Sequence, residues 1–199
     1  MTSASFLPEP RESEALASAY EDDLRSDGYV NNLTRVWGWR PDVLADFTEV
    51  RATLLAGTTL DDREIAVVVV ATASGLGDAY CSLAWGANLA ALTDDETAAG
   101  VLADAPGIPT LSPRERALAD WARQVARDPN STTAEDVEAL RAVGLTDREI
   151  FEATSLAAFR LAFSTVNDAL GARPDAGLAA RVPDAVRAAV TYGRPAADA

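Results

Sequence analysis

The chain alternates apolar, alanine-rich stretches with short polar segments in which a small polar residue is followed three residues later by an acid. In such a capping box, the polar side chain and the acid satisfy exposed amides at the start of a helix. The sequence offers several: 61–64, 93–96, 112–115, 133–136 and 146–149. Repeated helix-start signals of this kind predict an all-α protein.

The same signals set approximate boundaries for the helices. Pro41 suits a first helical turn, and Gly57 and Gly144 suit positions just after a helix end. The pattern predicts helices over residues 12–26, 41–56, 61–74, 78–92, 94–104, 112–127, 133–142, 146–170 and 183–191.

Residues 65–73 pose a conflict, because their run of valines has strand propensity. The cap formed by Asp61 and Glu64 precedes this run directly, and the run is apolar on all sides. A helix that is apolar all round is typical of the centre of a protein. We therefore predict a central core helix.

An internal echo relates two of the predicted helix starts. Leu60–Ile65 resembles Leu145–Ile150, and each opens a long apolar helix. Either the chain contains a degenerate duplicated unit or the same cap has been used twice.

Length and composition favour one domain over residues 1–199. Hydrophobic residues make up 48% of the chain, and the Pro/Gly stretch 105–109 is short enough to be a loop. The first residues lack the basic and apolar regions of a signal peptide, and there is one cysteine, so we expect a cytoplasmic protein. The net charge of −14 disfavours nucleic acid and anionic membranes as partners.

Missing residue types restrict the chemistry further. The chain has no histidine and no lysine. These absences exclude a Ser-His-Asp triad, a Cys-His pair, Schiff-base chemistry and a P-loop, and they disfavour a zinc site. We expect no metal and no organic cofactor. Proton transfer must run through Asp, Glu, Tyr, Cys or water.

The single cysteine lies at a predicted helix start. Gly77 breaks the chain, Asp78 caps a new helix, and Cys81 falls in its first turn. The positive end of the helix favours the reactive thiolate, whereas the charge of Asp78 raises the thiol pKa. A reactive thiol and a buried inert cysteine both remain open.

The order of these features resembles the alkylhydroperoxidase D / carboxymuconolactone decarboxylase family, specifically its peroxidase-related subgroup. Family members carry a Glu in a hydrophobic helix, then Cys-x-x-Cys, then a His four residues on. The resemblance covers roughly residues 20–175, and it implies an all-α helical bundle that forms a homodimer or homotrimer. Outside the segment around Cys81, the stretches that resemble the family are Gly28–Leu33, Arg40–Leu44, Leu111–Arg116, Gly144–Ile150 and Asn167–Gly171.

The resemblance also assigns positions within the site. Cys81 occupies the place of the cysteine that attacks peroxide, Asp78 that of the resolving cysteine, and Trp85 that of the histidine. Glu64 lies two residues farther from the motif than the family's glutamate, and Tyr80 directly precedes the cysteine.

These positions imply a thiol-dependent peroxidase with one active-site cysteine. Cys81 would become a sulfenic acid and be reduced by an external thiol, with Glu64 as proton relay and with Tyr80 or Trp85 orienting a small hydroperoxide. One alternative is decarboxylase-like acid/base chemistry on a carboxylate substrate, using Glu64, Asp78 and Tyr80. Another is a degenerate oligomeric scaffold without catalysis.

Arg160 stands out in the apolar stretch 157–163. If it faces the core, it needs a carboxylate partner, for which Glu64 or Asp78 is available. A pairing with Asp78 would offset that residue's effect on Cys81. Otherwise Arg160 lies on the exposed face of its helix.

Overall fold

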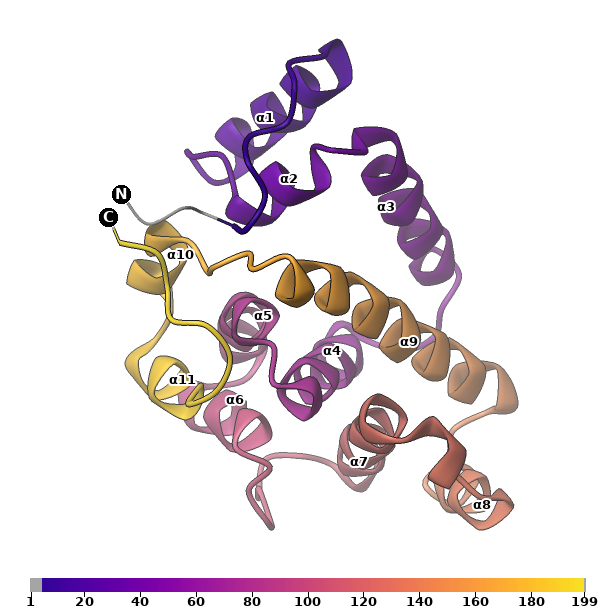
Figure 1. Ribbon diagram of the computed structural model, residues 1–199. Coiled ribbons are helices and arrows are strands. Elements are labelled where there is room, and N and C mark those ends of the chain that lie inside the picture. The colour runs from indigo at the N-terminus through magenta and orange to yellow at the C-terminus, as the bar shows by residue number, and fades with distance from the viewer. Residues whose placement is uncertain (1–4, 199) are drawn as a thin grey trace.

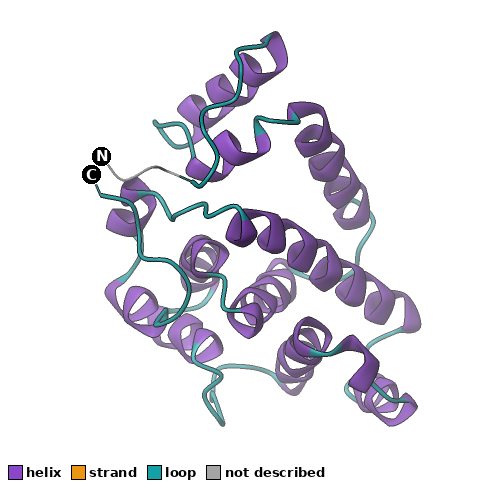
Figure 2. Cartoon of the chain, viewed as in Figure 1, coloured by secondary structure: helices purple, strands orange, loops and turns teal. Residues whose placement is uncertain are grey.

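The computed structural model describes residues 5–198, and over this range the chain forms helices and loops without strands (Figures 1 and 2). The elements are α1 (Glu14–Ser26), α2 (Asn32–Trp37), α3 (Pro41–Leu55), α4 (Asp62–Leu76), α5 (Ala79–Leu92), α6 (Asp95–Leu102), α7 (Pro113–Arg127), the 3₁₀ turn η1 (Pro129–Ser131), α8 (Ala134–Ala142), α9 (Asp147–Ala169), α10 (Ala176–Arg181) and α11 (Asp184–Ala189). The all-α prediction is confirmed.

Each predicted range contains a helix, and the sequence missed α2 and α10. Both are six residues long and begin without a side-chain hydrogen bond at the cap. Capping signals were the main basis of the prediction, so these two short helices went undetected. Helices α3 and α11 also begin without a side-chain cap but were predicted, α3 from Pro41 at its start. One cap was also placed wrongly, since α6 is capped by Asp94 rather than Thr93.

Helix α4 is the centre of the core, as its apolar sequence predicted. It packs against α5, α7 and α9, and the side chains of residues 67–70 are completely buried. Burying a valine contributes roughly 1.5–3 kcal/mol. The low helix propensity of valine costs less than about 0.7 kcal/mol. Burial therefore outweighs the strand preference of this run.

One arginine connects the two helix starts that have similar sequences. The capping boxes of Glu64 in α4 and Glu149 in α9 are both formed. Arg114 of α7 forms ion pairs with both carboxylates, at 2.7 Å from Glu149. The acids thus cap their own helices and also join α4, α7 and α9.

Helix α9 runs between two parts of the molecule (Figure 1). Helices α1, α2 and α3 lie on one side of it, and α4, α5 and α7 lie on the other. None of the helices within residues 5–198 has the length and apolar character needed to cross a membrane. The arrangement lets α9 present side chains both to the start of α5 and to α3.

Candidate functional site

The site is organised around the start of α5. Gly77 adopts a left-handed conformation with φ of 84°, which lets the chain turn directly from α4 into α5. The Asp78 side chain accepts a hydrogen bond from the backbone N–H of Cys81 at 3.0 Å. Asp78 and Cys81 are both buried, with exposed fractions of 0% and 2%. The predicted cap is therefore present.

Two side chains of α9 contact the sulfur of Cys81. Arg160 donates from Nη1 to Sγ at 3.2 Å, and the Ser164 hydroxyl lies 3.6 Å from Sγ. The two residues are four positions apart and so share one helix face. Arg160 is 9% exposed and forms no ion pair among the described residues. Arg160 therefore faces inward, as one of the two interpretations of the sequence predicted, but it pairs with neither of the available carboxylates, Glu64 and Asp78.

Burial dominates the protonation of the thiol. It raises the pKa of Cys81 to about 12; the Arg160 charge lowers that pKa, and Asp78 raises it further. The structure therefore holds Cys81 as a neutral thiol at pH 7. Activation by the helix N-terminus alone does not overcome desolvation at this position.

Two polar atoms beside the thiol are buried without a hydrogen-bond partner. They are Oδ2 of Asp78 and Nε of Arg160. An unsatisfied buried polar atom typically costs about 1–3 kcal/mol. A vacant acceptor on Asp78 and a vacant donor on Arg160, two residues that both contact Cys81, are suited to a site where a proton moves and a negative charge develops.

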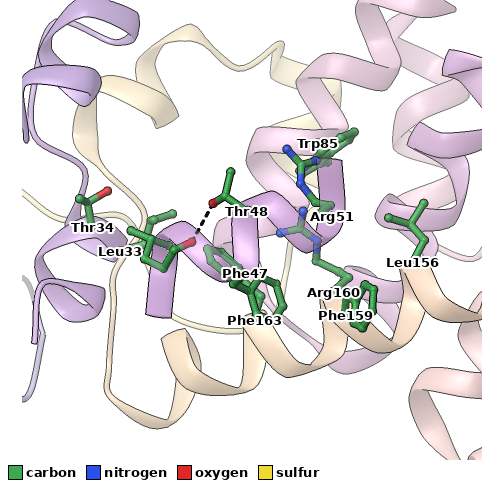
Figure 3. Close-up of a pocket in the computed structure, with 11 residues that line it drawn as sticks. Leu33, Thr34, Phe47, Thr48, Arg51, Trp85, Leu156, Phe159, Arg160 and Phe163 are labelled. Atoms are coloured by element: carbon green, nitrogen blue, oxygen red, sulfur yellow. Dashed lines mark hydrogen bonds between the residues drawn. The ribbon is translucent and has the colours of Figure 1, made fainter. Parts of the chain in front are cut away.

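A cavity of about 260 Å³ lies between α3 and α9 and reaches Trp85 of α5. Figure 3 shows the guanidinium groups of Arg51 and Arg160 pointing toward one another beside Trp85. Cys81 lies behind Arg160 and does not itself line the cavity. The lining residues are Leu33, Thr34, Leu44, Phe47, Thr48, Arg51, Trp85, Leu156, Phe159, Arg160 and Phe163.

The indole ring of Trp85 packs against both Arg51 and Arg160. The guanidinium carbon of Arg160 lies 5.5 Å from the centre of the indole ring, and that of Arg51 lies 6.0 Å away. Both distances are typical of cation–π contacts. The position that the resemblance assigns to a histidine is thus filled by a ring that orients cations and does not exchange protons.

Tyr80 is directed to different partners. Its hydroxyl donates to the Asp175 carboxylate, which also accepts from the backbone N–H of Asn32 at 3.0 Å. Burial and the Asp175 charge raise the pKa of Tyr80 above its usual value. Tyr80 packs with Val36 and Ala172 and joins α2 to the segment before α10.

Glu64 lies at the far end of α4 from the cysteine. Its carboxylate accepts from the Asp61 backbone N–H and from Arg114. A rise of 1.5 Å per residue places about 18 Å of helix between residue 64 and the end of α4. The structure therefore brings Cys81, Asp78 and Trp85 together, but it does not bring Glu64 or Tyr80 to the same side chains.

Sequence reasoning missed several residues of this region. Ser164 had a signal, since it follows Arg160 by one helical turn. No pattern in the sequence marked Arg51 or the phenylalanines of the cavity, because only the packing of α3 against α9 places these side chains in the cavity. Within residues 5–198, no group of three or more His, Cys, Asp or Glu side chains is placed to hold a metal ion.

Solved structures with similar folds cover most of the chain. One is an uncharacterized peroxidase-related protein from Ralstonia eutropha JMP134, described as an alkylhydroperoxidase AhpD core. It has 25% identity, a TM-score of 0.76, and coverage of 88% of this chain and 94% of its own. A peroxidase-related protein from Silicibacter sp. TM1040 has 23% identity, a TM-score of 0.76, and coverage of 87% and 93%.

A third similar structure is that of an enzyme with a bound halogenated compound. It is a cysteine-to-alanine variant of the debrominase Bmp8 in complex with 2,3,4-tribromopyrrole, with 16% identity and a TM-score of 0.69. The match covers 92% of this chain and 95% of that one. No protein-family model and no curated protein sequence matches the chain.

Proposed function

We propose that this protein, whose fold is similar to that of an alkylhydroperoxidase AhpD core, is a thiol-dependent peroxidase in which Cys81 is the reacting residue. The observation that carries the proposal is the hydrogen bond from Arg160 to the Cys81 sulfur. A buried arginine without a carboxylate partner is costly. Its cost is offset in the state in which the sulfur is negative, which is the state that attacks peroxide.

Asp78 is the proton acceptor in this proposal. Its Oδ2 atom is buried beside the thiol and has no hydrogen-bond partner. Transfer of the thiol proton to Asp78 leaves a thiolate that Arg160 and Ser164 stabilise. Glu64 has no part in this step, because its carboxylate is bound to Arg114.

The oxidation then follows by displacement. The thiolate attacks the terminal oxygen of an organic hydroperoxide, a sulfur–oxygen bond forms, and the oxygen–oxygen bond breaks. The departing alkoxide takes the proton held by Asp78 and leaves as an alcohol, and Cys81 remains as a sulfenic acid. Because Arg160 lies between the cavity and the sulfur, its side chain must shift for the peroxide to reach Cys81.

Reduction requires thiols from outside the chain, because Cys81 is its one cysteine. A first external thiol forms a mixed disulfide and releases water, and a second one restores Cys81 and leaves as the disulfide. We place this cycle in the cytoplasm, where such reductants are maintained. We further propose a homodimer or homotrimer, which light scattering on the purified protein tests.

Turnover of cumene hydroperoxide with a dithiol reductant tests the proposal. The wild type should consume peroxide and form a dimedone adduct at Cys81, and Cys81→Ser should do neither. Equal rates in both proteins, or no turnover in either, would contradict the peroxidase function.

Asp78→Asn separates the roles of Asp78. Asn caps a helix as well as Asp does, so the start of α5 is kept while the carboxylate is lost. Loss of the negative charge should make Cys81 alkylate faster, whereas loss of the proton carrier should slow peroxide turnover. If turnover rises in parallel with alkylation, Asp78 is not the base.

A second candidate is thiol-dependent removal of a halogen from a small aromatic ring. Two observations favour it: the aromatic lining of the cavity and the structural likeness to debrominase Bmp8. In this reaction the ring gains a proton and two electrons, halide leaves, and two external thiols become a disulfide. Bromide release from 2,3,4-tribromopyrrole, absent in Cys81→Ser, would support it. The acid/base alternative has no such support, because Glu64, Asp78 and Tyr80 bind different partners.

A further inference from the structure

The cavity contains two arginines that no carboxylate neutralises. Arg51 comes from α3 and Arg160 from α9, and the residues that line the cavity include no Asp or Glu. Among the described residues, neither arginine forms an ion pair with an acid. This is a local excess of positive charge in a chain whose net charge is −14.

Nothing nearby compensates for the two charges. Arg160 is nine-tenths buried, and its Nε has no hydrogen-bond partner. Burial lowers the pKa of Arg51, and the charge of Arg160 lowers it further. The rings of Trp85 and Phe163 lie at cation–π distance from Arg160, but a ring face carries only partial negative charge. An anion between the arginines would satisfy the donors and relieve their repulsion.

The rest of the cavity fits the apolar part of such an anion. Phe47, Phe159 and Phe163 line it next to the arginines (Figure 3). An apolar cavity of about 150 Å³ holds one benzene ring. The volume of about 260 Å³ here therefore accommodates one ring with a charged substituent.

We propose that Arg51, together with Arg160, binds the carboxylate of a single-ring aromatic acid. The substrate class of the site is then an aromatic acid whose reactive group reaches Cys81, a specification that rests on the proposed function. Arg160 serves both the thiol and the ligand, whereas Arg51, which packs on Trp85, serves the ligand but not the thiol. Arg51 is therefore the residue that selects a charged substrate over a neutral one.

Calorimetric titration with benzoate tests the site, and benzyl alcohol serves as the neutral comparison. The wild type should bind benzoate at least tenfold more tightly than benzyl alcohol. Arg51→Gln should lose this preference, since one charge-assisted contact corresponds to roughly ten- to a hundredfold in affinity. Arg11→Gln is the control. It removes an exposed arginine that does not line the cavity, makes the same change in net charge, and should retain the preference for benzoate.

Equal binding of the two compounds by the wild type, or absence of benzoate binding, would overturn the proposal. So would an equal loss of preference in Arg51→Gln and Arg11→Gln. Circular dichroism melts of both variants verify that they are folded. Cys81→Ser should still bind benzoate; if it does while the wild type turns over no peroxide, the anion site stands and the peroxidase function fails.

Discussion

Replacement of Arg160 is the most direct probe of the cysteine. The guanidinium nitrogen lies 3.2 Å from Sγ. At that distance, an effective dielectric constant between 80 and 20 gives an attraction of about 1.3 to 5 kcal/mol between a thiolate and the cation. Losing this attraction should raise the Cys81 pKa by about 1 to 4 units.

The rate of alkylation measures this effect. The thiolate fraction falls tenfold for each unit of pKa, but a more basic thiolate is intrinsically more nucleophilic, with a Brønsted coefficient of about 0.4–0.5. Cys81 in Arg160→Gln should therefore react with iodoacetamide roughly 3- to 250-fold more slowly than Cys81 in the wild type. Because Cys81 is the chain's one cysteine, mass spectrometry measures the alkylation of Cys81 without a contribution from other thiols.

Arg160→Lys is the matched comparison, because removal of the guanidinium also opens access to the sulfur. Lys and Gln have shorter side chains than Arg, but only Lys keeps the charge. We expect the Lys variant to alkylate faster than the Gln variant at every pH from 7 to 9. Equal rates would show that Arg160 merely covers the thiol, and the electrostatic argument would fail.

Three further variants test other assignments. Glu64→Gln should lower the free energy of unfolding by roughly 1–3 kcal/mol in urea melts, since it weakens the contact with Arg114, while Cys81 alkylation stays within twofold; a large loss of thiol reactivity would restore a relay role for this glutamate. Tyr80→Phe should likewise cost roughly 1–3 kcal/mol by leaving Asp175 without its hydroxyl donor, and unchanged peroxide turnover would separate it from catalysis. Burial and a neighbouring carboxylate raise the pKa of Asp168 from 3.8 to about 7, so the folded state binds this proton more tightly and the wild type loses stability as pH rises from about 4 to 7. The melting temperature of Asp168→Asn relative to wild type should therefore increase between pH 5 and pH 8, and a constant difference would contradict the shifted pKa.

Local patterns in the sequence were sufficient for most of the helices. The cap of Asp61 and Glu64 marked the start of α4, and the cap of Asp78 marked the start of α5. These signals are local because a helix start satisfies its amides with side chains a few residues away. Helices α2 and α10 were not predicted because they are six residues long and begin without a side-chain hydrogen bond at the cap.

The protonation state of Cys81 could not be predicted from the sequence. The first turn of a helix argued for a thiolate, but the pKa depends on how completely the surrounding helices exclude water. Burial decided it in favour of the thiol, and Arg160 is the residue that opposes burial. The sequence had marked Arg160 as unusual, but it offered no means of finding its partner 79 positions away.

By itself, the sequence determined an all-α chain, the capped helix that carries Cys81, and the absence of histidine and lysine chemistry. Only the tertiary structure decided that Arg160 lies on the sulfur, that Arg51 joins it in the cavity, and that Glu64 is bound elsewhere. The physical reason is one of range. Capping and periodicity act over three or four residues, whereas desolvation and charge pairing depend on side chains that only the packing of α3, α5 and α9 brings together.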